Sequence, residues 1–105
     1  MLHQLKIKSE YFLDVASGKK TFEIRKNDRD FHVGDFLGLN ELTEHSVNNK
    51  GEHKETGRFI LAEVTYVLTD TEYVKDGYAV LGIKPCTVQK EKVKEYEIFD
   101  EYKLV

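Results

Sequence analysis

The chain opens on an alternation of apolar and polar positions that is typical of a half-buried strand. Leu5 and Ile7 alternate with Gln4, Lys6 and Lys8. Successive side chains of a strand point to opposite faces, so this spacing predicts a first strand whose apolar residues face a core.

The pattern then changes to that of a short helix. Ser9 is the predicted N-cap, and Glu10 in the first turn suits the positive end of the helix dipole. Gly18 is the predicted left-handed stop. One helical face gathers the apolar side chains Tyr11, Phe12, Val15 and Ala16. A helix of about two turns is unstable in isolation, so we expect packing to hold it.

Residues 21–26 alternate again and predict a second strand. Phe22 and Ile24 share one side, which we expect to face the core. The polar side, expected to face a cleft or solvent, consists of Thr21, Glu23 and Arg25. Lys20 has the parity of the core side, yet it stands at the strand entrance, where the backbone can turn it outward.

Three more strands are expected further along the chain, separated by turns and loops. They cover Phe36 to Leu42, Arg58 to Leu68 and Tyr78 to Lys84, and Pro85 is expected to close the last one. The predicted buried positions of the last two strands are Ile60, Ala62, Val64, Tyr66, Leu68, Ala79, Leu81 and Ile83. The predicted turns and loops cover residues 27–30, 33–35, 43–57 and 69–77.

About five strands and one short helix within residues 1–85 predict a mostly β, α+β domain: a small, partly closed β-barrel with a flanking helix. Residues 86–105 form a charged C-terminal extension. Its apolar residues at three-residue spacing, Val93, Tyr96, Phe99 and Tyr102, suit a marginal amphipathic helix. Such a segment could pack on the barrel, pair with another chain or stay partly disordered.

Composition narrows the function classes. A length of 105 residues and 40% hydrophobic content fit one globular domain. The net charge of −3 argues against non-specific nucleic-acid binding, so any such binding needs a local patch. The single cysteine, Cys86, permits no disulfide within the monomer, and no apolar run is long enough for a membrane span. We therefore expect a cytoplasmic protein, and the sequence does not indicate its oligomeric state.

A local patch does exist at the junction of the predicted helix and second strand. Residues 18–29 hold the cations Lys19, Lys20, Arg25, Lys26 and Arg29. A guanidinium offers a planar fork of donors that matches a phosphate or a base edge, and an ammonium is a compact charge suited to phosphate. The purely structural interpretation is a surface ion pair between Glu23 and Arg25, which contributes about 0–1 kcal/mol to stability.

The residues Gly18-x-Lys20-x-x-Glu23-x-Arg25 match the signature of ASCH domains, which belong to the PUA-like superfamily. The longer string from Phe22 to Phe31, followed by Val33-Gly34-Asp35, resembles an uncharacterised bacterial and phage subgroup of that superfamily. The strings Thr56-Gly57-Arg58, Val64 to Leu68 and Gly77 to Ile83 occur in the same order there. The resemblance covers roughly His3 to Ile83.

This resemblance implies a PUA-like barrel in which Lys20, Glu23 and Arg25 line a cleft. Superfamily members bind RNA or read modified bases, so the implied partner is RNA or a nucleotide-like anionic ligand, bound by Lys20, Glu23, Arg25, Lys26 and Arg29. One ASCH type is an amidohydrolase for acylated cytidine. Its threonine nucleophile stands where this chain has Glu23, and a carboxylate cannot do that job.

Three function hypotheses follow. The leading one is a binding module in which Lys20 and Arg25 hold the anion. The alternative is a small nucleoside-processing hydrolase with candidate catalytic residues Lys20, Thr21 and Glu23, because Glu23 shares a strand face with Thr21 and can activate it or a water. The third is an interaction protein whose tail binds a partner. We expect no cofactor and no metal, because the acids and histidines of the predicted loop at residues 43–57 do not fit the ligand spacing of a zinc site.

Overall fold

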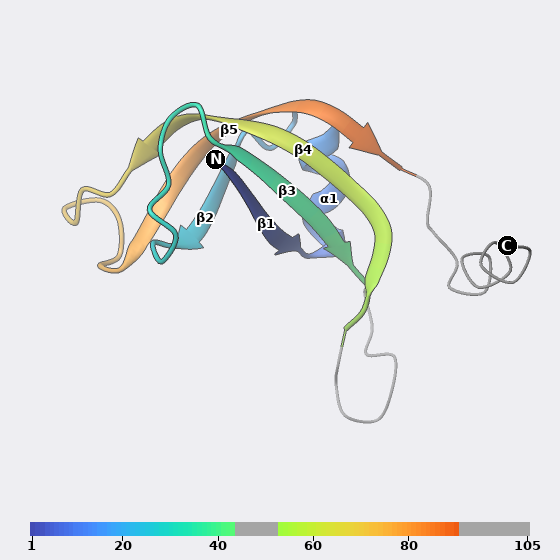
Figure 1. Ribbon diagram of the computed structural model, residues 1–105. Helices are drawn as coiled ribbons and strands as arrows, with labels where there is room; N and C mark the ends of the chain where they lie inside the picture. The colour runs from blue at the N-terminus through green and yellow to red at the C-terminus, as the bar shows by residue number, and fades with distance from the viewer. Residues whose placement is uncertain (44–52, 91–105) are drawn as a thin grey trace, which may run out of the picture.

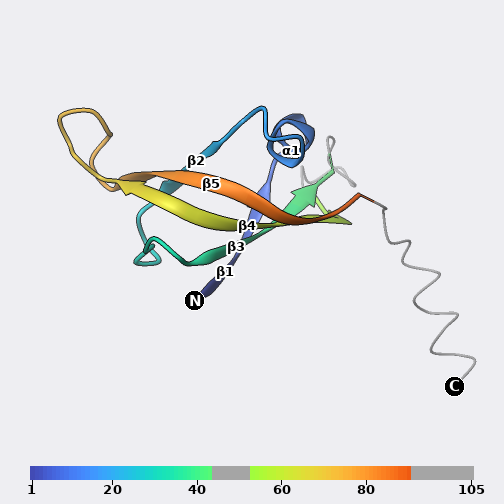
Figure 2. The same ribbon diagram turned by 90° about the horizontal axis from the view of Figure 1, so that it is seen from above.

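A computed structural model describes residues 1–43 and 53–90 of the chain. The described elements are β1 (Leu2–Ile7), α1 (Ser9–Ala16), β2 (Phe22–Lys26), β3 (Phe36–Leu42), β4 (Glu55–Leu68) and β5 (Tyr78–Gln89). The five strands form one sheet in the order β1-β3-β4-β5-β2. The sheet curls into a half-barrel, with α1 on one of its faces (Figures 1 and 2). The predicted mostly β architecture with one short helix is confirmed for this part of the chain.

The sheet is antiparallel except at one edge. β1 runs parallel to β3, with Leu5 opposite Leu39. The other pairs, β3 with β4, β4 with β5 and β5 with β2, are antiparallel. β1 and β2 are thus the two edge strands, and no backbone ladder joins them.

The core lies between the concave face of the sheet and α1. Phe12 and Val15 of the helix are fully buried there, each contributing about 1.5–3 kcal/mol by transfer from water. That burial holds an eight-residue helix that could not persist alone. The sheet contributes the buried side chains Leu5, Ile7, Leu37, Leu39, Ile60, Ala62, Val64, Ala79, Leu81 and Ile83.

Only the C-terminal end of α1 agrees with the sequence prediction. Gly18 has φ of 79°, the left-handed conformation expected of the stop. The N-cap is Lys8, which makes no side-chain capping hydrogen bond, so Ser9 is the first helical residue and the predicted Ser9 cap is wrong. The helix therefore depends on its buried face rather than on a cap.

Two register shifts explain two wrong predictions about β4 and β5. A shift between Val64 and Tyr66 turns the strand over, so Tyr66 is exposed although its parity predicted burial. A second shift beside Ala62 lies opposite Pro85, where a residue without an N–H does not interrupt the ladder. β5 therefore continues through Pro85 to Gln89. β4 likewise begins at Glu55, inside the predicted loop.

The predicted C-terminal extension of residues 86–105 begins inside β5, and its residues 91–105, with the predicted amphipathic helix, lie outside the described residues. The boundary between residues 1–85 and 86–105 stays a prediction. Glu44, His45 and Glu52 of the predicted loop also lie outside the described ranges.

Candidate functional site

Glu23 and Arg25 of the signature lie on the concave side of β2, where the sequence predicted Phe22 and Ile24. Glu23 is opposite Leu81 and Arg25 opposite Ala79, two buried core residues of β5. Glu23 is 5% exposed, whereas Phe22 and Ile24 are 43% and 58% exposed. The prediction that Phe22 and Ile24 face the core is therefore wrong. A polar set can occupy the inner side because its opposite charges satisfy one another.

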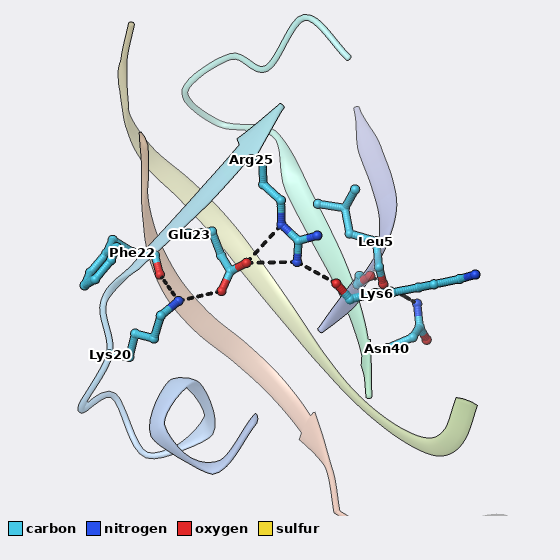
Figure 3. A network of polar contacts seen from close by, with 8 residues as sticks. Leu5, Lys6, Lys20, Phe22, Glu23, Arg25 and Asn40 are labelled. Atoms are coloured by element: carbon cyan, nitrogen blue, oxygen red, sulfur yellow. Dashed lines mark hydrogen bonds and ion pairs between the residues drawn. The ribbon is translucent and has the colours of Figure 1, made fainter. Parts of the chain in front are cut away.

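Glu23 is the centre of an ionic network drawn in Figure 3. Its Oε1 accepts a hydrogen bond from Nζ of Lys20 at 2.8 Å, and its Oε2 accepts one from Nε of Arg25 at 3.0 Å. Nη2 of Arg25 lies 2.9 Å from the same Oε2. Lys20 also donates to the carbonyl of Phe22 at 2.6 Å. The ammonium, the carboxylate and the guanidinium therefore converge, and both Glu23 oxygens are occupied by protein donors.

Two arginines connect the β2 region to the opposite edge of the sheet. Nη2 of Arg25 donates to the carbonyl of Lys6 at 2.7 Å (Figure 3), and Nη1 of Arg29 donates to the carbonyl of Gln4 at 3.1 Å. Both carbonyls belong to β1. The N–H of Phe36 in β3 donates to the carbonyl of Met1, so alternate carbonyls of β1 point away from β3, toward the open edge. Side chains thus connect the two edge strands where backbone pairing is absent. We call this line of approach between β1 and β2 the seam.

A hollow of about 420 Å³ lies along this seam. Its wall consists of Gln4, Leu5 and Lys6 from β1 and Arg25, Lys26, Asp28, Arg29 and Phe31 from β2 and the following turn. Among the described residues, Nη1 of Arg25 and both Nε and Nη2 of Arg29 have no protein acceptor. These N–H groups keep unused donor capacity, and the volume of the hollow falls within the range of small-molecule sites.

The other predicted site residues fall into two groups, those that line the hollow and those that do not. Lys26 and Arg29 line the hollow and are exposed. Lys20 does not line it, because its ammonium is drawn toward Glu23 and lies over the rings of Tyr11 and Phe22. Thr21 is exposed, and its hydroxyl contacts neither Glu23 nor Lys20 in the described structure.

No broad aromatic surface faces this hollow. Phe12 is fully buried, and Phe31 is 5% exposed, with its ring against His3. Tyr11 lies beside Lys20 and is not part of the hollow's wall. This hollow therefore offers no exposed ring on which a base could stack.

No pattern in the sequence indicates that β1 contributes to the hollow. Gln4 and Lys6 looked like the solvent side of an ordinary strand, and Asp28 like a turn residue. They join the site only because the sheet curls and brings its two edges together. The spacing of motifs along the chain contains no signal of that approach.

A second buried carboxylate lies on the concave face, away from the hollow. Glu41 is 4% exposed and accepts a hydrogen bond from the Thr56 hydroxyl at 2.9 Å. Nε of Arg58 lies 3.4 Å from the same Glu41 oxygen, and the Arg58 guanidinium lies 4.5 Å from the ring centroid of Phe12. The Thr56-Gly57-Arg58 string thus holds β3, β4 and α1 together.

Asp35, which the sequence indicated as a turn residue, connects the start of β1 to the turn before β3. It accepts hydrogen bonds from Nε2 of His3 at 2.9 Å, the backbone N–H of His32 at 3.0 Å and the N-terminal ammonium at 3.1 Å. The His3 hydrogen bond, followed by the His32 N–H and the ammonium, holds the pKa of Asp35 far below its ordinary value. The sequence indicated no partner for His3.

This contact predicts a loss of stability in acid. A lowered pKa in the folded protein stabilises the fold above the ordinary carboxyl pKa of 3.8, and the stabilisation is lost as the pH falls below it. The melting temperature of the native protein should fall more than that of Asp35→Asn between about pH 5 and about pH 2. Thermal melts followed by circular dichroism test this, and parallel curves for the two proteins would contradict it.

The described residues contain neither a candidate metal site nor a helix that could span a membrane. No group of three or more histidine, cysteine or carboxylate side chains there could hold a metal ion. Residues 1–43 and 53–90 also contain no helix long and apolar enough to cross a membrane.

Comparison with known proteins places the chain in a family. A family model described as a domain of unknown function, DUF3850, matches residues 2–83. The chain belongs to the DUF3850 family. The matched range covers every element from β1 to the inward-facing part of β5, and it includes the ionic network and the hollow.

A curated relative of this DUF3850 chain is an uncharacterized 12.9 kDa protein in the GpA 3′ region of Escherichia phage P2. The two are 34% identical over 92 residues, which is 84% of this chain and 77% of the relative. The similarity therefore extends over most of both proteins.

Proposed function

We propose that this DUF3850 domain binds RNA or a nucleotide-like ligand through the seam between β1 and β2. The supporting observation is the hollow lined by Lys6, Arg25, Lys26 and Arg29, with unpartnered guanidinium N–H groups on Arg25 and Arg29. Arginine N–H groups are well matched to phosphate oxygens. A cationic hollow on a protein of net charge −3 favours a directed site over a diffuse one.

Within this proposal, the roles of the signature residues differ. Glu23 positions Arg25 and Lys20, because both of its oxygens are engaged by those cations. Arg25 uses Nε and Nη2 inside the protein and presents Nη1 to the ligand. Lys26 and Arg29 supply the outer part of the cationic wall. Membership of the ASCH group and a cytoplasmic location belong to the same proposal, and the signature and the curled β-sheet support the first of these.

The hydrolase alternative gains no support from this geometry. Both oxygens of Glu23 already accept hydrogen bonds from Lys20 and Arg25, and the Thr21 hydroxyl contacts neither Glu23 nor Lys20 in the described structure. General base catalysis requires hydrogen-bond reach to the proton that is removed. The alternative stays an untested hypothesis.

Binding of short single-stranded RNA should be measurable at low salt and should weaken steeply as salt rises. Each phosphate neutralised by a cation contributes a slope of about −0.7 to a plot of log K against log salt for single strands. The exposed cations of the hollow therefore predict a slope of roughly −2. Fluorescence anisotropy at several salt concentrations measures it. No binding at low salt, or a flat plot, would contradict the proposal.

A further inference from the structure

We infer that this hollow recognises a terminal phosphomonoester, as on a nucleoside monophosphate or at a phosphorylated strand end, rather than the internal phosphodiesters of a nucleic-acid strand. This inference rests on the proposed function and names the ligand class of the same site. It follows from how the charge, the donors and the apolar groups are distributed around the seam.

The charge is concentrated at one place. Arg25, Lys26 and Arg29 line one hollow of about 420 Å³ with a single carboxylate, Asp28, whereas the Lys6 side chain extends away from Arg25 (Figure 3). The Lys20–Glu23 pair behind Arg25 adds one charge of each sign, so the cations exceed the acids by two, four against two. A phosphodiester carries one negative charge, whereas a phosphomonoester carries about −1.5 to −2 at pH 7. Concentrated positive charge therefore favours the monoester.

The donors suit the three terminal oxygens of a monoester. Among the described residues, Nη1 of Arg25 and Nε and Nη2 of Arg29 have no protein acceptor. The carbonyls of Lys6 and Gln4 fix one nitrogen of each guanidinium at 2.7 Å and 3.1 Å, which sets the orientation of the remaining N–H groups. Preorganised donors of this kind lower the ordering cost of binding.

This hollow lacks the features of a site that binds along a nucleic-acid strand. Proteins that hold single strands combine a charged groove along the backbone with exposed aromatic rings on which successive bases stack. Here the apolar wall residues, Leu5 and Phe31, are 8% and 5% exposed. The phosphate therefore supplies most of the recognition, and the identity of the base should matter little.

The test compares two RNA oligonucleotides labelled at the 3′ end. One carries a 5′-phosphate, and the other is one nucleotide longer with a 5′-hydroxyl, so that their total charges are similar. The phosphorylated strand should bind at least tenfold more tightly, and changing its first base should have little effect. Arg29→Ala should reduce this preference to about one, whereas Lys84→Ala, an exposed lysine outside the hollow, should preserve it.

Competition with adenosine 5′-monophosphate distinguishes the two sources of the monoester. If adenosine 5′-monophosphate competes with an affinity similar to that of the phosphorylated strand, the ligand is a free nucleotide. If it competes much more weakly, the ligand is the phosphorylated end of a strand. Equal binding of the two strands, with a steep salt dependence, would overturn this inference and leave the proposed function standing. No binding of any of these ligands would overturn both.

Discussion

Replacing Glu23 with alanine is expected to lower the free energy of unfolding by about 3 kcal/mol, the low end of the range for breaking a buried ion pair. The substitution leaves Lys20 and Arg25 without their shared counter-charge on the concave face. Their side chains are 19% and 22% exposed, so both can turn partly toward water, which moderates the loss. The measurement is urea denaturation followed by circular dichroism.

The matched control for this prediction is Glu72→Ala. Glu72 is exposed and its carboxylate makes no ion pair in the described structure, so this change should stay within about 0.5 kcal/mol of the native protein. The double variant Lys20→Ala/Glu23→Ala should lose less than the sum of the single losses, because the two residues contact each other. A stability of Glu23→Ala within error of the native value would show that the network does not hold the fold.

Replacing both Lys26 and Arg29 with alanine is expected to weaken the binding of single-stranded RNA by roughly tenfold to a hundredfold at low salt. Both residues line the hollow and carry a charged donor, and a hydrogen bond to a charged group contributes about 1.5–3 kcal/mol before solvent screening. The salt slope should also become shallower by about 1.4, since two phosphate contacts are removed. Anisotropy titrations at several salt concentrations measure both quantities.

The charge-matched control is Lys75→Ala/Lys84→Ala, which removes two exposed lysines outside the hollow. It should bind nearly as the native protein does. The melting temperature of Lys26→Ala/Arg29→Ala should fall little, because Lys26 and Arg29 are both exposed. Equal weakening by both double variants would assign the binding to overall charge rather than to the seam.

The sequence predicted the type of most described elements, because local patterns decide them. Gly18 marked the end of α1, and the alternation of Ala79, Leu81 and Ile83 gave the inner side of β5. It also grouped Lys20, Glu23 and Arg25 as one set, and in the structure both cations contact Glu23. Close spacing on one strand side is enough to bring such charges within reach.

The sequence failed where tertiary structure overrides the local pattern. Apolar parity placed Phe22 and Ile24 in the core, yet the self-satisfied charges took the inner side. The register shift beside Tyr66 reversed its direction. The contacts from Arg25 and Arg29 to β1 depend on the curl of the whole sheet, and no spacing in the chain encodes a contact between two edges.

The central claim is that Arg25 and Arg29 bind the ligand at the seam, and the side-chain N–H signals of the arginines test it directly. The chain has three arginines, so a ¹⁵N-labelled protein should give three Nε–H signals in a two-dimensional NMR spectrum. Addition of a 5′-phosphorylated oligonucleotide should shift the signals of Arg25 and Arg29 while that of Arg58, held by Glu41 and Phe12, stays in place. Unmoved signals from Arg25 and Arg29, with binding detected elsewhere or not at all, would contradict the account.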